Sequence, residues 1–318
     1  MNFMFSFSYP DCSSYYFKKY QDLPTRGAHA VEHFTIDGSL FLAFANFKSD
    51  TAEKYNTDSF IYKFNDLTGK FFLYQTIGTH GGHDVEYFSI SGKHYLAVAN
   101  AYNGTTSRMN SVIYLWNGTS FFAFQNIATN GGWKNNMFEK FQEIATEGCR
   151  ASAAFVINNE SYIALANAVR SASSVVYKRA GMHFVKLQNL QKHRAMDIKS
   201  FFIIDDVFLA IASQPESYIN KWNGSQFVQF KTILTSGARA LHPFVMCGQT
   251  FLGLADQYRT KTVLYQFSAL GQFTKYQELL TFGAIDMTSF EYKGHTYLAI
   301  ANYGNNQRNI ESTVYKGI

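Results

Sequence analysis

The stretch Phe41-Leu42-Ala43-Phe44-Ala45-Asn46 decides the fold, because close copies of it recur along the chain. In every copy, small residues alternate with large apolar residues. Alternate side chains of a strand face opposite sides, so one face of each copy is small, the other is large, and both are apolar. We expect such a strand to be buried on both sides, with the small face admitting a close neighbour. The further copies begin at Tyr95, Tyr162, Phe208, Phe251 and Tyr297.

Three other elements accompany each copy and complete a unit of four short strands. An alternating stretch that ends in an aromatic precedes it, as in Asp84 to Phe88. A Ser-x-x-Tyr stretch follows it, and then a stretch of the form Phe-x-x-aromatic-Gln-x-aliphatic. The pairs Asn117-Gly118 and Asn223-Gly224 predict tight hairpins, because both residue types tolerate positive φ. Four strands in about 40–50 residues are typical of a β-propeller blade.

The two ends of the chain together supply one complete four-stranded unit. The last unit stops after its third strand at Tyr315, while Phe17 to Leu23 supply a fourth strand without a unit of its own. Pairing these segments would close the ring and remove its exposed edges. We therefore predict an all-β fold, a single β-propeller domain over residues 17–318 preceded by an N-terminal lead over residues 1–16.

The number of blades stays open at this point. The interval between Asn100 and Asn167 is 67 residues long and holds an extra copy of the fourth strand, Phe138 to Ile144. Either the ring has six complete blades and an inserted strand, or a seventh blade has lost its middle. The remnant would span about residues 128–147.

Composition limits the classes of protein to consider. The 318 residues are 47% hydrophobic and 17% aromatic, which excludes a disordered chain. A net charge of +5 is too dilute for a nucleic-acid-binding surface, so no nucleic-acid partner is expected. The best apolar run, Phe201 to Ala212, is broken by Asp205 and Asp206, so no membrane-spanning segment or direct membrane insertion is expected.

The cysteines and the N-terminus leave the compartment open. Cys12, Cys149 and Cys247 lack the spacing of metal ligands, and their odd number fits one disulfide with a free thiol or three buried thiols. Residues 1–12 lack the basic and apolar regions of a clear signal peptide. A secreted protein would then have lost its leader or be part of something larger.

The repeat unit resembles a known family. The succession aromatic-Leu-Ala-x-Ala-Asn, Ser-x-x-Tyr-x-Trp and Phe-x-x-Tyr-Gln-x-Leu is similar to the EAR or epitempin (EPTP) repeat, over residues 17–316. Leucine-rich glioma-inactivated proteins, a thrombospondin-type laminin G protein and a very large adhesion G-protein-coupled receptor share this repeat. The resemblance implies a secreted or ectodomain propeller of seven blades that binds cell-surface proteins. The truncated third blade departs from that pattern. The chain shows no leucine-rich, laminin G or membrane module, so roles of the whole relatives do not transfer.

One register of the first strand predicts a ring of acids in the channel. Ala30, Asp84, Ala151, Asp197, Ala240 and Asp286 each stand four residues before the aromatic that ends the strand. Three acids on one ring repel unless a cation or water neutralises them. Glioma-inactivated relatives carry a channel calcium ion on such acids, so the resemblance implies a structural calcium site at Asp84, Asp197 and Asp286. Alternatively, these side chains cap strand ends or are solvated in a wide channel. No other cofactor is expected.

Four Asn-x-Ser/Thr sequons are candidate glycosylation sites in exposed turns or loops, and they favour an extracellular protein mildly. They are Asn103, Asn117, Asn159 and Asn223. Three of them coincide with Asn-Gly pairs, which turns favour in any case.

Other suggestive motifs have a simpler structural explanation. His80-Gly81-Gly82-His83-Asp84 has metal-ligand residue types, but a solvated glycine turn between blades is the expected structure. Trp116 and Trp222 occupy one register and are expected to pack the blades rather than to stack on a sugar or base. Asp205 and Asp206 are adjacent, so in a strand they would face opposite sides, and a turn is their expected place.

Function is predicted to be binding rather than catalysis, because the sequence carries no G-x-S-x-G, P-loop, G-x-G-x-x-G or H-E-x-x-H motif. We expect a non-enzymatic extracellular module that binds a cell-surface receptor or an adhesion or matrix protein, with roles in cell adhesion or signalling. Lectin-like glycan binding is the alternative, and a hydrolase that uses the channel acids is a third. The loops Lys48–Thr57, Tyr102–Asn110 and Tyr303–Asn309 should carry binding on one face.

Overall fold

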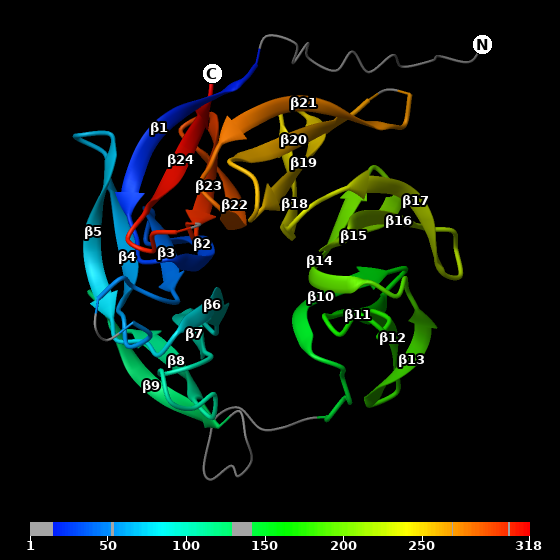
Figure 1. Ribbon diagram of the computed structural model, residues 1–318, viewed down its shortest axis with the longest axis horizontal. Helices are drawn as coiled ribbons and strands as arrows, with labels where there is room; N and C mark the ends of the chain where they lie inside the picture. Colours follow the sequence, from blue (N-terminus) through cyan, green and yellow to red (C-terminus); the bar gives the residue numbers. More distant parts are fainter. Residues whose placement is uncertain (1–14, 52–53, 129–141, 269, 305) are drawn as a thin grey trace.

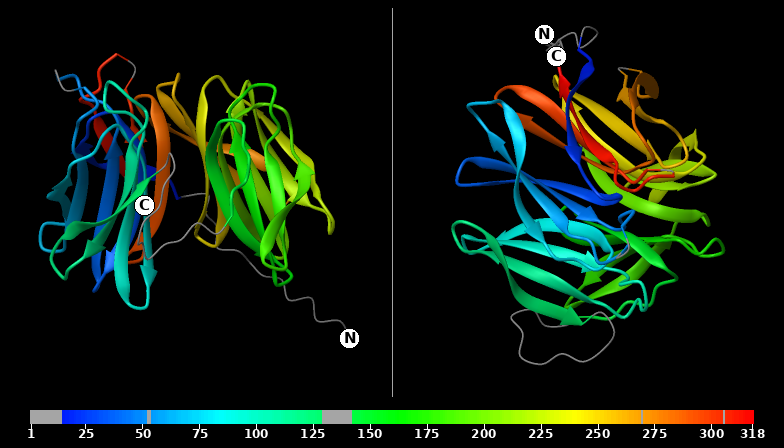
Figure 2. Two further views of the ribbon diagram at one scale, coloured as in Figure 1. Left: turned by 90° about the horizontal axis from the view of Figure 1, so that it is seen from below. Right: turned by 60° about the vertical axis from the view of Figure 1, so that its left-hand side comes forward.

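The computed structural model describes residues 15–51, 54–128, 142–268, 270–304 and 306–318, and these form six four-stranded antiparallel sheets. The sheets surround a central axis as the blades of a β-propeller (Figure 1). Their connections gather at the two ends of the ring (Figure 2). No helix in the described ranges is long and apolar enough to cross a membrane. The predicted all-β propeller is confirmed.

Each blade runs from an inner to an outer strand in chain order. Blade 1 contains β2 (Ala28–Ile36), β3 (Ser39–Asn46), β4 (Ser59–Asn65) and β5 (Lys70–Ile77). Blade 2 contains β6 (Gly82–Ile90), β7 (Lys93–Asn100), β8 (Asn110–Trp116) and β9 (Phe121–Ala128). Blade 3 contains β10 (Cys149–Ile157), β11 (Glu160–Asn167), β12 (Val175–Ala180) and β13 (His183–Asn189).

The remaining blades follow the same order, and the last of them closes the ring. Blade 4 contains β14 (Arg194–Ile203), β15 (Asp206–Gln214), β16 (Glu216–Trp222) and β17 (Phe227–Leu234). Blade 5 contains β18 (Ala238–Met246), β19 (Gln249–Asp256), β20 (Lys261–Phe267) and β21 (Phe273–Leu280). Blade 6 contains β22 (Ala284–Tyr292), β23 (His295–Asn302), β24 (Glu311–Gly317) and, as its outer strand, β1 (Phe17–Pro24). The predicted pairing of the two ends is confirmed.

The hairpin turns differ from the sequence-based expectation. Asn117 and Asn223 do not adopt positive φ, and only the glycine that follows each of them does. The Asn117 Oδ1 instead accepts N–H bonds from Thr119 and Ser120, as an Asx turn does. Two-residue turns with both φ values positive lie between the first and second strands, for example at Asp37-Gly38. The predicted turn positions were right, but the predicted backbone geometry of the Asn-Gly pairs was wrong.

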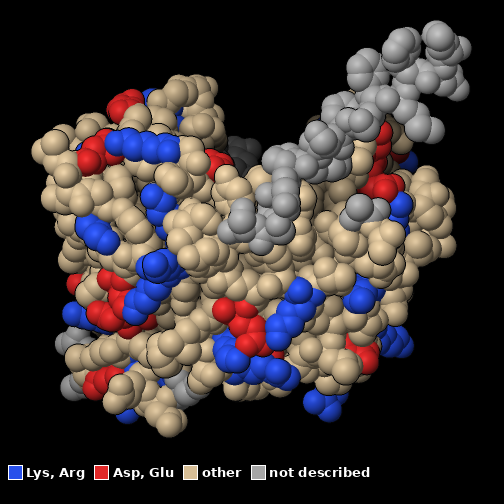
Figure 3. All heavy atoms as spheres, turned by 90° about the horizontal axis from the view of Figure 1, so that it is seen from above, with Lys and Arg blue, Asp and Glu red and all other residues tan. Residues whose placement is uncertain are grey.

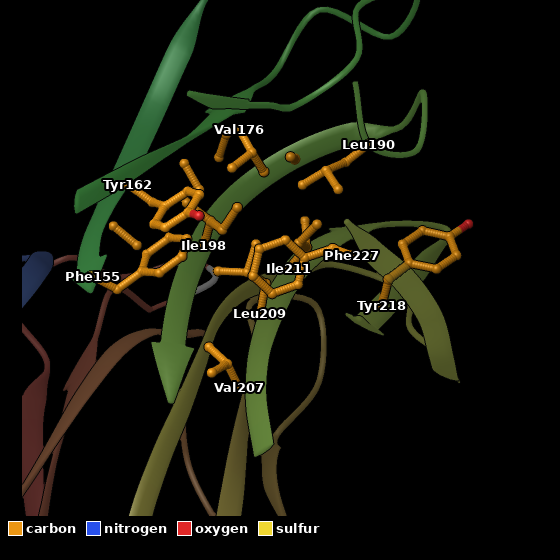
Figure 4. Packing of buried hydrophobic residues seen from close by; sticks show 14 of the residues in the cluster. Phe155, Tyr162, Val176, Leu190, Ile198, Val207, Leu209, Ile211, Tyr218 and Phe227 are labelled. Atoms are coloured by element: carbon orange, nitrogen blue, oxygen red, sulfur yellow. The ribbon is translucent and has the colours of Figure 1, made fainter. Parts of the chain in front are cut away.

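Apolar side chains fill the junctions between consecutive blades. Five buried clusters join blades 1 and 2, 3 and 4, 4 and 5, 5 and 6, and 6 and 1. In the cluster between blades 3 and 4, Tyr162 and Phe155 of blade 3 face Ile198 and Phe227 of blade 4 (Figure 4). These clusters hold the blades at fixed angles and so position the inner strands around the axis.

The small residues of the second strand are buried against the next blade, as the alternation of small and large residues predicts. Ala43 and Ala45 are fully buried, and Val85, Leu96 and Val98 of the next blade pack in the same cluster. The corresponding position in blade 5 is Gly253. There, a Cβ would lie 2.4 Å from the Sδ of Met287 in blade 6, so the larger neighbour takes the space of the missing methyl.

A glutamine in the outer strand of one blade clamps the outer strand of the next blade. The Gln75 Oε1 accepts the N–H of Phe121 at 2.9 Å, and its Nε2 donates to the Phe121 carbonyl at 2.6 Å. Gln21 makes the same pair of bonds to Phe71, Gln188 to Phe227, and Gln277 to Phe17. The Gln of the repeat motif is therefore a structural residue that fixes the register between blades.

Among the described residues, no equivalent apolar junction lies between blades 2 and 3. None of the five apolar clusters of the described residues spans these blades, whose ribbons stand apart in Figure 1. Of the predicted strand Phe138 to Ile144, residues 138–141 lie outside the described residues, and residues 142–144 form no strand. Yet Gln142 clamps the Phe184 main chain with bonds of 2.8 and 2.9 Å. Gln142 of the extra motif thus makes the clamp of a seventh outer strand, while the described residues form only six blades.

The Gln142 clamp gives a direct test of this arrangement. Gln142→Ala should lower the free energy of unfolding by about 1–3 kcal/mol, because the N–H and carbonyl of Phe184 lose both partners. Gln75→Ala should have a similar effect. Chemical denaturation measures both variants, with Gln272→Ala in an exposed turn as the control. A Gln142→Ala variant as stable as the control would show that the extra motif does not fasten the ring.

Candidate functional site

The inner strands enclose a channel cavity of about 670 Å³. All six innermost strands contribute to its lining, and the three predicted acids Asp84, Asp197 and Asp286 are among the lining residues. Ala30, Ala151 and Ala240 occupy the alternate blades of the same ring. The predicted position of this ring of residues in the channel is therefore confirmed.

A β-bulge in each inner strand adds a second ring of side chains at one mouth of the channel. The pairing of β6 with β7 shifts between Gly82 and Asp84, so His83 is the extra residue. The same shift makes Arg150 and Arg239 the extra residues of β10 and β18. A bulge bends the strand and re-aims the side chain that it adds. Strict alternation would turn these residues away from the acids, so the sequence pattern gives no sign that they line the channel.

We call Arg150, Arg239, His29 and His83 the arginine collar. The Arg150 Nη1 lies 3.4 Å from the His83 Nε2, and the Arg239 Nε donates to the Gln257 Oε1 at 2.6 Å. The His29 ring lies 4.9 Å from the His83 ring. Burial and then the charges of Arg150 and Arg239 lower the pKa of His83 to about 4, so its imidazole is neutral at pH 7.

Two of the three aspartates fasten neighbouring blades. The Asp286 Oδ2 accepts the N–H of Val31 in blade 1 at 3.0 Å. The Asp197 Oδ2 accepts the N–H of Leu241 in blade 5 at 3.3 Å. Asp84 stands at the junction without an apolar cluster, and its carboxylate accepts the N–H of its own neighbour Val85 at 3.0 Å. The acids therefore take part in the backbone hydrogen bonding of the ring.

An ammonium group supplies positive charge next to these acids. Lys199 lines the cavity two residues after Asp197, and the charges of Asp197, Asp286, Asp84 and Glu86 raise its pKa. Burial raises the pKa of Asp84 to about 6, of Asp286 to about 7 and of Glu32 to about 8, while the Lys199 charge opposes each of these shifts. The channel thus carries more acid than base below the collar, with Lys199 as a built-in counter-charge.

The three predicted loops lie together on the face that holds the arginine collar. The Asp50 carboxylate accepts the N–H groups of Arg308 and Asn309 at 2.7 and 2.9 Å, which ties the loop of blade 1 to that of blade 6. The Tyr55 ring lies 4.8 Å from the Tyr102 ring, which ties it to the loop of blade 2. Their predicted placement on one face is confirmed. We call the described residues of Lys48–Thr57, Tyr102–Asn110 and Tyr303–Asn309 the loop face; residues 52, 53 and 305 lie outside the described residues.

The suggestive histidines do not form one site. His80 bonds the Asn56 Oδ1 at 2.7 Å, while His83 faces the channel. The glycines between them are buried, and a Cβ on Gly82 would lie 2.9 Å from the Ser59 Oγ. The expectation of a solvated glycine turn was therefore wrong. Close packing of blade 1 against blade 2 explains these glycines.

The remaining sequence predictions have mixed outcomes. Trp116 and Trp222 pack against the inter-blade clusters, as expected. Asp205 lies in a turn, whereas Asp206 begins β15 and pairs with Lys221 at 2.7 Å.

Asn117, Asn159 and Asn223 are exposed and Asn103 is half-buried, while glycosylation of all four stays a prediction. Cys247 is disulfide-bonded and Cys149 is a free, exposed thiol, and Cys12 lies outside the described residues.

The predicted calcium ion has no ready site in this arrangement. Across the described part of the chain, no three His, Cys, Asp or Glu residues are grouped so that they could hold a metal ion. Calcium binding therefore stays a prediction. A calcium ion on these acids should raise the midpoint of thermal unfolding, and Asp286→Asn should abolish the rise. An equal midpoint in calcium and in a chelator would leave Lys199 as the cation that neutralises the channel.

The raised pKa of Asp286 gives a pH-dependent prediction. A carboxyl whose pKa is raised on folding contributes stability below its usual pKa and loses it as the pH rises through about 7. Asp286→Asn keeps an oxygen for the Val31 N–H and removes the charge. Its free energy of unfolding relative to the wild type should therefore increase by about 1–3 kcal/mol from pH 4 to pH 8. Denaturation at both pH values measures this, with Asp205→Asn as the exposed control; a pH-independent difference would contradict the prediction.

Comparison with solved structures identifies the fold. A protein of unknown function from Dyadobacter fermentans aligns with a TM-score of 0.54 at 10% identity, covering 94% of this chain and 99% of that one. A Trypanosoma rangeli sialidase in complex with the inhibitor DANA aligns with a TM-score of 0.56 at 8% identity, covering 92% and 55%. At such low identity these similarities show the fold alone.

Comparison of sequences identifies closer relatives. The human thrombospondin-type laminin G domain and EAR repeat-containing protein is 38% identical over 161 residues, which are 51% of this chain and 22% of that protein. Human leucine-rich repeat LGI family member 2 is 22% identical over 259 residues, which are 79% of this chain and 42% of that protein. The aligned stretches thus span less than half the length of either relative.

The family model of the EPTP domain matches most of the chain, and its third matched segment begins in the extra motif that holds Gln142. The matched segments are residues 17–65, 70–117, 137–179, 183–223 and 272–316. This coverage, together with the propeller fold and the repeated Gln clamp, shows that the chain belongs to the EPTP domain family.

Proposed function

We propose that this chain is a non-enzymatic extracellular module that binds a protein receptor or an adhesion or matrix protein at the cell surface. The loop face carries the proposal. Its three loops are joined to one another by the Asp50 hydrogen bonds and the Tyr55–Tyr102 contact, so the surface is held in one shape before a partner arrives. A preorganised surface loses little conformational entropy on binding.

The chemistry of the loop face suits a protein partner. Arg308 lies 4.0 Å above the Tyr303 ring, and Lys48 lies 5.3 Å from the Tyr55 ring. Tyrosine and arginine are enriched among the residues that contribute most to protein–protein affinity. Elsewhere, basic and acidic residues are interspersed over the side of the ring shown in Figure 3, without an extended field of one sign. That pattern does not favour a nucleic-acid partner.

The proposed extracellular location has support from two further features. Cys247 is disulfide-bonded, and structural disulfides persist mainly in oxidising compartments. The exposed Asn117, Asn159 and Asn223 offer places for glycans away from the apolar junctions. Mass determination of protein secreted from animal cells, before and after enzymatic removal of N-glycans, tests occupancy at these sites and at Asn103.

Cell binding tests the function. Labelled, clustered protein should bind cultured cells, and mild protease treatment of the cells should abolish binding while glycosidase treatment does not. The double variant Lys54→Glu/Arg108→Glu, changed at two exposed positions of the loop face, should bind at least about tenfold more weakly.

A matched double variant controls for the change in net charge. Lys93→Glu/Lys186→Glu introduces the same charge change at exposed positions outside the loop face and should bind like the wild type. Loss of binding after glycosidase alone would overturn the proposal in favour of a glycan ligand. Equal loss in both double variants would show that net charge, and not the loop face, governs binding.

A further inference from the structure

The arginine collar holds positive charge that the described residues do not neutralise. Arg150 contacts the neutral His83, and Arg239 contacts the Gln257 amide and, at 3.9 Å, the Met196 sulfur. Neither guanidinium is paired with a carboxylate within the described ranges. Half-buried lysines elsewhere do have such partners, as in the 2.7 Å pairs Lys178–Glu160 and Lys221–Asp206. The two arginines at the channel mouth are thus left with donors for an outside group.

An aromatic wall connects the arginine collar to the loop face. The His29 ring stacks on Phe47 with ring centres 4.4 Å apart and meets the edge of Tyr303 at 4.8 Å. Arg308 covers the other part of this wall through its contact with Tyr303. A group that enters the mouth from the loop face therefore passes aromatic surface before it reaches Arg150 and Arg239.

The channel below the collar restricts what can enter. Asp84, Asp197 and Asp286 line the next layer, and Glu32 and Glu86 line the cavity with them. A second negative group pushed beyond the collar would meet these acids. The mouth therefore favours a single carboxylate held at the collar over a polyanion threaded into the channel.

We propose that the arginine collar binds one carboxylate of the protein partner, from an acidic side chain or a chain terminus, with the apolar stem or an adjacent aromatic residue of that partner lying against His29, Phe47 and Tyr303. The planar fork of a guanidinium donates two parallel N–H bonds to a carboxylate, which gives direction as well as attraction. This inference rests on the proposed function and names the chemistry of the partner at the centre of its interface.

Within the arginine collar, the arginines carry the positive charge at pH 7 and the histidines are neutral. Burial first, and then the charges of His83, Arg239, Arg150 and Arg308, lower the pKa of His29. With both imidazoles neutral at pH 7, the positive charge of the collar is that of the arginines. The imidazoles therefore add no pH dependence, but Asp286 and Glu32 below the collar, with pKa values of about 7 and about 8, ionise as the pH rises from 6.5 to 8. Binding of a carboxylate should consequently weaken over this rise in pH, and it should also weaken as salt rises.

Capped dipeptides test the site without an identified partner. Acetyl-Phe-Glu-amide should bind the full chain in calorimetric or NMR titration, and acetyl-Phe-Gln-amide should bind about 10-fold to 100-fold more weakly. Arg150→Gln/Arg239→Gln should weaken binding of the glutamate peptide by a similar factor. Arg179→Gln, in the exposed β12–β13 hairpin, is the matched control and should leave binding unchanged.

A second variant separates loss of the site from loss of the fold. Arg150→Lys/Arg239→Lys keeps both charges but lacks the guanidinium fork, so its affinity should lie between those of the wild type and the glutamine variant. The thermal midpoint of each variant shows whether the fold is intact. Equal affinity for the two peptides, or unchanged affinity in a folded Arg150→Gln/Arg239→Gln variant, would overturn the proposal.

Cell binding distinguishes failure of this inference from failure of the proposed function. A folded Arg150→Gln/Arg239→Gln variant should bind cells at least about tenfold more weakly. Undiminished cell binding would overturn the carboxylate proposal while leaving the loop face as the receptor surface. Competition by a sulfated or sialylated glycan, but not by the glutamate peptide, would overturn it in favour of an anionic glycan.

Discussion

The ring depends on carboxamide side chains that each offer one donor and one acceptor to the main chain. The Gln of an outer strand bonds both groups of a Phe in the next blade, as Gln75 does with Phe121. The Asn that ends a second strand works within its blade: the Asn46 Oδ1 accepts the N–H of Arg26, and its Nδ2 donates to the carbonyl of Asp58. A carboxylate or an alkyl group of similar size could satisfy only one of these partners, or neither. This requirement explains the Asn at this position in blades 1, 2, 3 and 6, whereas blades 4 and 5 have Ser213 and Asp256 there.

Residues beside the junction of blades 2 and 3, where the described residues form no apolar cluster, differ from their counterparts at the other junctions. Ala97 and Ala99 on the small face of β7 are partly exposed, whereas their counterparts Ala43 and Ala45 are fully buried by the following blade. Asp84 stands at the same junction and bonds within its own strand, while Asp197 and Asp286 each bond the next blade. Gln142 nevertheless anchors the connecting segment to blade 3. Gln142 thus supplies the outer clamp on blade 3 at a junction where the described residues add no further inner strand.

The channel shows how far a periodic sequence can locate a site. Period-two alternation and the spacing to the terminal aromatic were enough to place Asp84, Asp197 and Asp286 on one ring. The same alternation would place Arg150 and Arg239 on the opposite face, because it assumes an unbroken ladder. Each first strand contains a bulge, and the added residue turns to the channel mouth. A bulge results from pairing with the neighbouring strand, and no residue pattern within one strand marks it here. Lys199 was missed for another reason, since a lone lysine in a strand gives no sign that Asp84, Glu86, Asp197 and Asp286, from three different blades, act on its charge.

The sequence alone determined the repeat, its four strands, the closure by Phe17 to Leu23 and the family, because all of these follow from local periodicity repeated six times. It also located the three loops of the loop face, since a connection between fixed strands must lie at one end of the ring. Only the tertiary structure decided that the histidines His80 and His83 diverge, that the Asn-Gly turns need a single positive φ, and that the arginines meet at one mouth. These features depend on how strands from different blades approach one another. Distances between residues far apart in the chain are set by the packing of whole sheets, which no single repeat encodes.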